Sequence, residues 1–343
     1  MSVIPTLTDV ARKAEVSLAT VDRVINGRPN VRAKTVERVK AAMAELGYRP
    51  DPLAAGLARR RRYRFVFMLP TGTNAFMADL ARQIEGMREW LLTSRTVVET
   101  LQADVFEPEE LAAAIDGIDR AVDGAAIVAL DHPDVRRAVD RLVLDGVRVV
   151  TLISDIPASR RIRFVGIDNA SAGRSAGALI GRFAGGRRGS VGVLVGSLSL
   201  RDHVDRCFGF SQVLERQFPN LSICPVTETR DDRGRTEEAT RALVDTKQDL
   251  IALYNAGAGN MGVAKALSGI SKDQRPITVG HELTDHSIEA LREGVFDAVL
   301  AQNPGHQVRS AARILLAAAN RTSIIEEQER IRIDIFIREN LPF

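Results

Sequence analysis

The sequence of 343 residues is poor in several features, and each shortage excludes a class of protein. It contains two cysteines, Cys207 and Cys224, without CxxC or metal-ligand spacing, so neither a disulfide framework nor a zinc site is expected. It has no run of about 18 apolar residues, the length that a membrane-spanning helix requires. The first residues, MSVIPTLTDV, contain neither the basic nor the apolar segment of a signal peptide. We therefore expect a cytoplasmic protein.

Net charge is also small, at +3, but the charges are unevenly distributed. Residues 1–64 hold 14 Lys and Arg against 6 Asp and Glu, which leaves the remaining residues with a net charge of −5. A basic module on a mildly acidic body is typical of a protein that meets a polyanion at one end. A basic tail on a membrane surface is the alternative, but residues 1–64 lack the Trp and Phe anchors of such tails.

The stretch Leu7–Asn26 predicts two short helices joined by a tight turn at Glu15 and Val16. Ser17 offers a hydroxyl that can cap the second helix. The residues expected to pack between the two helices are Leu7, Val10, Ala11, Ala14, Val21, Val24 and Ile25. The outward face of the second helix carries Leu18, Ala19, Asp22, Arg23 and Asn26. This pattern is typical of a helix-turn-helix that enters the DNA major groove, and a generic helical hairpin is the alternative.

A third helix is expected from Ala33 to Leu46, with Gly47 ending it. Its buried stripe is predicted at Val36, Val39, Met43 and Leu46. Pro50 and Pro52 then break the helical pattern, and four consecutive arginines follow at 59–62. This segment fits either a charged linker or a hinge that folds only against DNA. We therefore divide the chain into a headpiece at 1–49, a hinge at 50–64 and a body at 65–343.

From Phe65 onward, apolar strands alternate with amphipathic helices, which predicts parallel sheets covered by helices on both faces. Strands are expected at 65–69, 97–101, 125–130, 148–153, 164–167, 190–195, 222–227, 250–254, 276–279 and 298–301, with single helices at, for example, 76–93 and 108–122. So many strands exceed one doubly wound sheet, so two α/β lobes are expected. Lobe 1 is predicted at about 65–167 and 302–328, and lobe 2 at about 168–301. The tail at 330–338 suggests a final strand, which the sequence does not assign to either lobe.

Three segments together resemble the lactose-repressor (LacI/GalR) family of bacterial transcription regulators: Thr6–Asn26, Ala33–Tyr48 (AKTVERVKAAMAELGY) and Pro50–Leu57. The body resembles the periplasmic sugar-binding-protein fold of the ribose-binding type, so the resemblance covers essentially the whole chain. It implies a small all-α helix-turn-helix headpiece joined to an α/β two-lobe domain of the type I periplasmic-binding-protein-like class. The chain departs from the family pattern at Glu15, Asp22, Arg32 and Gly56.

The resemblance implies specific DNA contacts. Leu18, Ala19 and Arg23 match the base-reading positions, and Arg23 can make a bidentate contact to guanine. Candidates for phosphate contacts are Thr6, Ser17, Thr20, Asn26, Arg28, Lys34 and Thr35. Leu57 matches the hinge leucine that wedges into the minor groove, with Ala54 beside it. Two hinges must meet at one base step, so the resemblance implies a homodimer on a pseudo-palindromic double-stranded operator.

Polar residues that follow the strands of the body are candidates for binding a small sugar or polyol between the lobes. Asn74, Phe76, Ser154, Asp155 and Arg206 match polar or stacking positions of the resembled fold. Asp131, Asn255, Glu282 and Gln302 come directly after other predicted strands. Carboxylates and amides that pair with adjacent hydroxyls are what recognition of a polyol requires.

Two other classes of protein fit parts of the sequence. Gly257–Gly262 is a literal GxGxxG after a strand, with Glu282 twenty residues on, as in an NAD-binding oxidoreductase. The motif lies late in the body, and no catalytic partners in dehydrogenase-like spacing accompany it. A solute-binding protein for transport would need a signal peptide and no basic headpiece. We therefore expect a homodimeric repressor, not an enzyme, with no cofactor, no metal site and no catalytic residues.

Overall fold

The computed structural model describes residues 5–25, 29–48 and 62–342. Contacts divide the chain into two units, Met1–Arg61 and Arg62–Phe343, each with a hydrophobic core of its own. Four predicted DNA contacts lie outside the described residues: Asn26, Arg28, Ala54 and Leu57. The predicted hinge also lies outside them up to residue 61.

The N-terminal unit contains α1 (Leu7–Lys13), α2 (Leu18–Ile25) and α3 (Ala33–Leu46). Its core is built from Val10, Ala11, Ala14, Val21, Val39 and Ala42. Val24, Ile25, Met43 and Leu46 are half-buried and pack against this core, whereas two predicted core residues, Leu7 and Val36, do not join it. Leu7, at the first position of α1, is 36% exposed, and the buried stripe of α3 runs through Ala42 rather than through Val36.

Local hydrogen bonds fix the ends of these helices. Thr6 and Asp9 form a reciprocal capping box at the start of α1. The Ser17 hydroxyl accepts a hydrogen bond from the Thr20 backbone N–H at 3.2 Å, as predicted for the N-cap of α2. Gly47 ends α3 with a left-handed φ of 63°. Arg32 precedes α3 and gives it no side-chain cap, as expected of a residue whose side chain accepts no hydrogen bonds.

The turn between α1 and α2 predicts one stabilising substitution. Glu15 adopts a left-handed φ of 50°, a conformation that costs about 1–2 kcal/mol for a residue with a Cβ. Glycine avoids that cost but loses more chain entropy on folding, about 0.5–1 kcal/mol. We expect Glu15→Gly to stabilise the N-terminal unit by up to about 1 kcal/mol, measured as hydrogen-exchange protection of α1 and α2 in the full chain. Glu37→Gly, within α3, should lower protection by a similar amount, and equal effects of the two changes would refute the strain argument.

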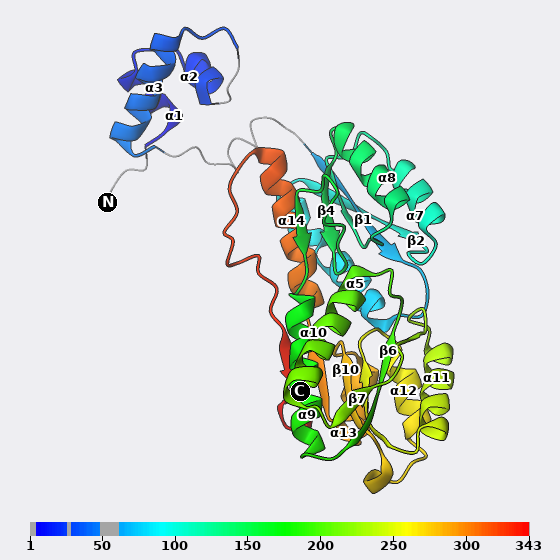
Figure 1. Cartoon of the computed structure of the whole chain (residues 1–343). Helices are drawn as coiled ribbons and strands as arrows, with labels where there is room; N and C mark the ends of the chain where they lie inside the picture. The colour runs from blue at the N-terminus through cyan, green and yellow to red at the C-terminus, as the bar shows by residue number, and fades with distance from the viewer. Residues whose placement is uncertain (1–4, 26–28, 49–61, 343) are drawn as a thin grey trace. The chain divides into compact units, whose positions relative to one another are not determined.

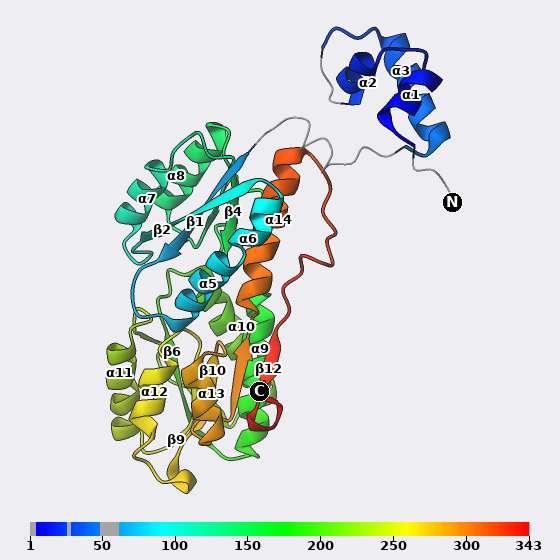
Figure 2. The ribbon, with the colours of Figure 1, turned by 180° about the vertical axis from the view of Figure 1, so that it is seen from behind.

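The C-terminal unit begins with a five-stranded parallel sheet in the order β2-β1-β3-β4-β5. Its strands are β1 (Tyr63–Pro70), β2 (Thr96–Ala103), β3 (Gly124–Ile127), β4 (Arg148–Leu152) and β5 (Arg163–Val165). Its helices are α5 (Ala75–Gly86), α6 (Arg88–Thr93), α7 (Pro108–Asp116), α8 (Pro133–Leu144) and α14 (Pro304–Asn320). Figures 1 and 2 show α7 and α8 on one face of this sheet and α5, α6 and α14 on the other. This half of the unit is lobe 1. The single helix expected at 76–93 is broken at Met87, after Gly86.

Lobe 2 is a seven-stranded sheet in the order β12-β11-β10-β9-β6-β7, with β8 also paired to β6. Its strands are β6 (Gly189–Val195), β7 (Leu221–Ile223), β8 (Thr227–Glu228), β9 (Leu250–Asn255), β10 (Ile277–His281), β11 (Ala298–Ala301) and the antiparallel β12 (Asp334–Phe336). Its helices are α9 (Asn169–Ala184), α10 (Arg201–Gln217), α11 (Arg233–Thr246), α12 (Asn260–Leu267) and α13 (Asp285–Arg292). The single strand predicted at 222–227 is two strands, because Pro225 between them has no N–H for the ladder.

Three segments connect the lobes. The chain crosses after β5, returns between β11 and α14, and crosses again after α14 to place β12 beside β11 (Figure 1). The return puts α14 against the sheet of lobe 1, where Val308 and Leu315 join its core. The predicted fold class is confirmed: a small all-α unit precedes an α/β unit of two lobes.

The described residues bear on two features discussed from the sequence, membrane-spanning helices and the two cysteines. No helix in this part of the chain is long and apolar enough to cross a membrane. Cys207 and Cys224 are both free thiols.

Candidate functional site

A cavity of about 270 Å³ lies between the two lobes. Lobe 1 contributes the segment after β1 and the residues that follow β2 and β4, and lobe 2 contributes the start of α10 and the segments after β8, β9 and β10. The residues that line it with polar side chains include Asn74, Asp104, Ser154, Asp202, His203, Arg206, Arg230, Asp231, Arg235 and Glu282. The carboxyl ends of parallel strands are where α/β folds bind ligands, so this cavity is the candidate site.

Backbone strain concentrates at this cavity. Eight described residues other than glycine have a positive φ, and four of them line it: Ile153, Arg230, Asp231 and Glu282. For the β-branched Ile153 a φ of 65° is a marked outlier. Strained residues of this kind cost about 1–3 kcal/mol each and cluster at ligand sites. The strain is independent support for a binding function.

Arg206 lines the cavity and is only 2% exposed. Its Nε donates to the Asn169 side-chain oxygen at 2.9 Å, and its Nη1 donates to the Ala256 carbonyl at 2.8 Å. Its Nη2 lies 3.8 Å from a Glu282 oxygen and 3.9 Å from an Asp202 oxygen, beyond hydrogen-bond distance. The guanidinium is therefore fixed in place, and its Nη2 nitrogen is left to donate to a ligand.

Three buried polar atoms around Arg206 have no hydrogen-bond partner in the described residues: Arg206 Nη2, Asp202 Oδ1 and Glu282 Oε2. A buried polar group without a partner costs about 1–3 kcal/mol. A hydroxyl group can donate to a carboxylate and accept from a guanidinium at the same time. This trio therefore matches the hydroxyls of a polyol.

Glu282 is held by a hydrogen-bond relay from lobe 1. Gln302, in the crossing between the lobes, donates to Glu282 Oε1 at 2.8 Å, and Gln307 of α14 donates to the Gln302 oxygen at 2.5 Å. Burial raises the pKa of Glu282 to about 7, although Arg206 and Gln302 lower it in part. Gln302, a predicted ligand contact, does not line the cavity and acts on Glu282 instead.

The packing of α9 against α10 determines where Arg206 lies. A Cβ at Gly173 would lie 1.9 Å from the Arg206 carbonyl oxygen, and a Cβ at Gly209 would lie 2.0 Å from the Ala170 carbonyl oxygen. Both distances are far below van der Waals contact, so the two helices touch backbone to backbone at these glycines. Only glycine permits the approach that brings Arg206 into the cavity.

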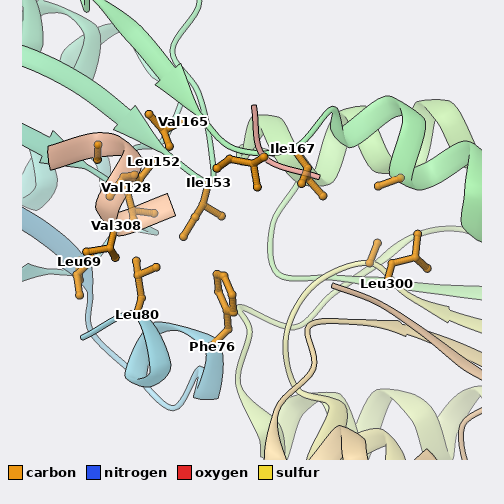
Figure 3. Close-up of a cluster of buried hydrophobic side chains, with 14 of the residues drawn as sticks. Leu69, Phe76, Leu80, Val128, Leu152, Ile153, Val165, Ile167, Leu300 and Val308 are labelled. Carbon is orange, nitrogen blue, oxygen red and sulfur yellow. The ribbon is translucent and has the colours of Figure 1, made fainter. Parts of the chain in front are cut away.

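Lobe 1 gives the cavity an apolar wall. Figure 3 shows Phe76, from the start of α5, pointing toward Ile153, and both residues line the cavity. Asn74 caps α5 with its side-chain oxygen, and its amide donates to Asp231 of lobe 2 at 3.3 Å. An aromatic ring beside polar groups suits a ligand with one apolar face, such as a pyranose.

Three further predicted contacts, like Gln302, do not line this cavity. Asp131 pairs with Arg136 at 2.9 Å, and Asp155 pairs with Arg161; neither lines this cavity. Asn255 is buried, and its amide donates to the Ala258 carbonyl and to the Asn260 side chain. Asp131 and Asp155 follow strands, and Asn255 is the last residue of β9, but nearby groups hold each side chain away from the cavity.

Sequence reasoning missed several lining residues. Asp202 lies four residues before Arg206 on α10, so helical spacing alone places both on one face. Arg230 and Asp231 lie in the loop before α11, and Arg230 reaches lobe 1, where it pairs with Glu107 at 2.8 Å and with Asp104 at 3.4 Å. No motif in the sequence marks this loop.

In the N-terminal unit, α2 presents the predicted reading face. Leu18 is 51% exposed, and Ala19 and Arg23 are exposed as well. The predicted phosphate contacts divide into two groups. Thr6, Ser17 and Thr20 use their hydroxyls in helix caps or in contact with each other, whereas Lys34 is exposed and Thr35 half-buried at the start of α3.

The GxGxxG motif serves close packing. A Cβ at Gly262 would lie 2.2 Å from the Arg233 carbonyl oxygen, where α12 meets α11, and Gly259 has a φ of 91° at the start of α12. A Cβ at Gly257 would lie 2.6 Å from the Gly196 nitrogen at the end of β6. Packing thus explains all three glycines without a dinucleotide.

Two lobes with a polar cavity at their strand ends define the chain's larger unit as a ligand-binding domain of the periplasmic-binding-protein class. The family model for the periplasmic binding protein domain matches residues 65–323, and the model for bacterial regulatory proteins of the lacI family matches residues 6–51. The chain therefore belongs to the family of the periplasmic binding protein domain, and its residues 6–51 match the DNA-binding domain of the lacI family.

Individual proteins agree with this assignment. The catabolite control protein A of Priestia megaterium is 34% identical over 163 residues, which are 48% of this chain and 47% of that protein. The chain thus matches about half the length of this relative. A glucose-galactose binding protein from Geobacillus stearothermophilus has a TM-score of 0.72 at 22% identity, over 82% of this chain and all of that one. A solute-binding protein from Burkholderia graminis, in complex with D-arabinose, has a TM-score of 0.72 at 20% identity, over 81% of this chain and 96% of that one.

Proposed function

We propose that the chain is a homodimeric repressor that binds a pseudo-palindromic operator and is controlled by a small polyhydroxylated effector. The observation that carries the sensor half of this proposal is the trio of unpartnered buried atoms on Arg206, Asp202 and Glu282. Hydroxyls of a bound polyol would satisfy all three. The sugar-binding proteins that share the fold support a sugar or polyol as the effector.

The effector would act by closing the lobes. Arg230 already bridges them through Glu107, and Asn74 bridges them through Asp231. A ligand between the lobes adds contacts that exist only when they are closed, and this differential affinity shifts the conformational equilibrium, typically by about 1–3 kcal/mol. Closure would change how the two sensor domains of a dimer are oriented toward each other. The distance between the two α2 helices that contact the operator would then change as well.

Catalysis is not part of the proposal. No group of three or more His, Cys, Asp or Glu in the described residues is arranged to hold a metal ion. The glycines of the NAD fingerprint are explained by packing against α11 and β6. Transport is disfavoured because the match to the lacI family at residues 6–51 adds a DNA-binding unit that transport does not need.

The DNA-binding half is tested with the full chain and the DNA upstream of its own gene. We expect footprinting to show a pseudo-palindromic site, with affinity that falls steeply as salt rises. Arg23→Ala should weaken operator binding by about 1–3 kcal/mol and relax the preference at one base pair. Arg216→Ala, an exposed arginine on α10, serves as the control and should leave binding unchanged. A chain without salt-sensitive DNA binding would refute the proposal.

A further inference from the structure

The two lobes give the ligand cavity walls of different chemistry. Lobe 2 contributes mostly charged side chains, among them the trio of Arg206, Asp202 and Glu282 with its unpartnered atoms. Lobe 1 contributes six large apolar side chains: Phe76, Met77, Val105, Phe106, Val128 and Ile153. A ligand between the lobes therefore meets hydrogen-bonding groups on one side and a hydrocarbon surface on the other.

The polar side chains that lobe 1 places at the cavity are already engaged by the protein. Asn74 caps α5 with its oxygen and donates to lobe 2 with its amide. One Asp104 oxygen accepts from a backbone N–H of its own loop at 2.8 Å, and the other lies 3.4 Å from Arg230. The Ser154 hydroxyl accepts from the Arg201 N–H at 3.1 Å. The two threonines of the loop after β1 line the cavity as well, but they are exposed.

Two acids that follow strands of lobe 1 are also kept from the ligand. Asp131 pairs with Arg136, and Asp155 pairs with Arg161. Lobe 1 thus has little to offer a buried hydroxyl of the ligand. Such a hydroxyl would lose its hydrogen bonds to water without replacement, which weakens binding by roughly tenfold. A hydrogen atom or a methyl group at the same point has no such cost.

Ile153 is an independent sign that this wall has to be apolar. Its φ of 65° lies in the left-handed region, which glycine and asparagine adopt with less strain than a β-branched residue. The side chain is 5% exposed, and Figure 3 shows it next to Phe76. A wall that required only this backbone shape would be met by asparagine or glycine. The strained isoleucine points to a requirement for hydrocarbon at this position.

We propose that the effector has two chemically different sides. Its hydroxyls would contact Arg206, Asp202 and Glu282, and an apolar substituent, such as the methyl group of a deoxysugar or the aglycone of a glycoside, would contact the wall of lobe 1. A fully hydroxylated sugar is then the poorer ligand. This inference rests on the proposed effector-binding function and specifies the class of effector.

The test uses the full chain and pairs of probes that differ at one position. Calorimetric titrations compare galactose, glucose and mannose with their 6-deoxy forms, and methyl glucoside with phenyl glucoside. We expect the more apolar member of at least one pair to bind about tenfold more tightly. The deoxysugars and the phenyl glucoside distinguish a methyl-sized from an aryl-sized substituent.

A matched pair of variants assigns this preference to the wall of lobe 1. Ile153→Asn replaces hydrocarbon by an amide at a backbone conformation that asparagine tolerates, so it should remove the tenfold preference. Ile162→Asn, at a 47% exposed isoleucine of the same lobe, should keep it. The titrations of the unaltered chain decide the question even if Ile153→Asn does not fold.

The inference is overturned if the fully hydroxylated member of every pair binds as tightly as the apolar member. A folded Ile153→Asn chain that kept the preference would overturn it as well. Fully hydroxylated sugars that bind and alter operator affinity in those cases would leave the proposed function intact. If no probe binds, the proposed function fails, and this inference fails with it.

Discussion

Gly173→Ala is expected to abolish effector binding and to destabilise the C-terminal unit by about 3 kcal/mol or more. The added Cβ would lie 1.9 Å from the Arg206 carbonyl oxygen and under 3 Å from two further backbone atoms of that residue. Because α10 presents backbone at this point, no side-chain rotation can relieve the overlap, and α9 and α10 must separate. Overpacking of this kind typically costs about 1–3 kcal/mol, and backbone overlap lies at the upper end of that range.

The loss of affinity follows from the same movement. Arg206 is held by Asn169, at the start of α9, and by the Ala256 carbonyl, so a shift of α10 relative to α9 breaks at least the first hydrogen bond. A displaced guanidinium no longer faces Glu282, whereas Asp202, on the same helix, moves with Arg206. Thermal unfolding measures the stability, and titration with the best sugar or deoxysugar measures the affinity.

Gly86→Ala is the matched control. A Cβ at Gly86 has nothing within 4 Å, and the residue ends α5 with an ordinary φ. Alanine there should leave affinity unchanged and stabilise the fold slightly, by about 0.5–1 kcal/mol. If Gly173→Ala and Gly86→Ala behaved alike, the close approach of α9 to α10 would not be what positions Arg206.

The sequence indicates where the strands end but not which way the following side chains point. Arg206, Phe76 and Glu282 were predicted at the cavity and line it. Asp131 and Asp155 follow strands equally well, yet arginines five and six residues later in the chain hold them away from it. Whether a carboxylate pairs with an arginine or lines the cavity depends on distances of a few ångström. The spacing of residues along the sequence does not give these distances.

Backbone strain and close packing are also invisible in the sequence. Ile153 and Glu282 are ordinary residues by composition, and only the structure shows their left-handed backbone. The GxGxxG motif shows the reverse error, because Gly257, Gly259 and Gly262 satisfy a cofactor pattern for reasons of packing. The sites of lowest predictability are therefore the ones where tertiary contacts override local preference, as expected at a functional site.

The second large effect concerns pH. The pKa of Glu282 rises from 4.5 to about 7 on folding, first because burial disfavours its charged form and despite opposing effects of Arg206 and Gln302. The folded chain thus binds this proton more tightly than the unfolded chain. The resulting stability is fully present below pH 4.5 and is lost as pH rises through 7. Each pKa unit corresponds to about 1.4 kcal/mol, so the loss amounts to about 3 kcal/mol.

Glu282→Gln should remove this dependence, because glutamine resembles the protonated acid and does not titrate. At pH 5 the variant and the parent chain should be about equally stable, whereas at pH 8 the variant should be more stable by about 3 kcal/mol in urea unfolding. Glu329→Gln is the opposite control. Burial alone would raise the pKa of Glu329, but two hydrogen bonds of 2.7 Å from Arg313 lower it overall, so this variant should be less stable at pH 8.

Glu282→Gln should also weaken effector binding, because Glu282 Oε2 is one of the unpartnered atoms around the cavity. Stability would then rise and affinity fall at pH 8 in a single variant, the trade-off expected of a residue kept for function at the expense of the fold. A variant that gained no stability at pH 8 would show that Glu282 is already satisfied in the free protein. In that case its unpartnered oxygen would not be a vacant ligand contact, and the sensor would depend on Arg206 and Asp202 alone.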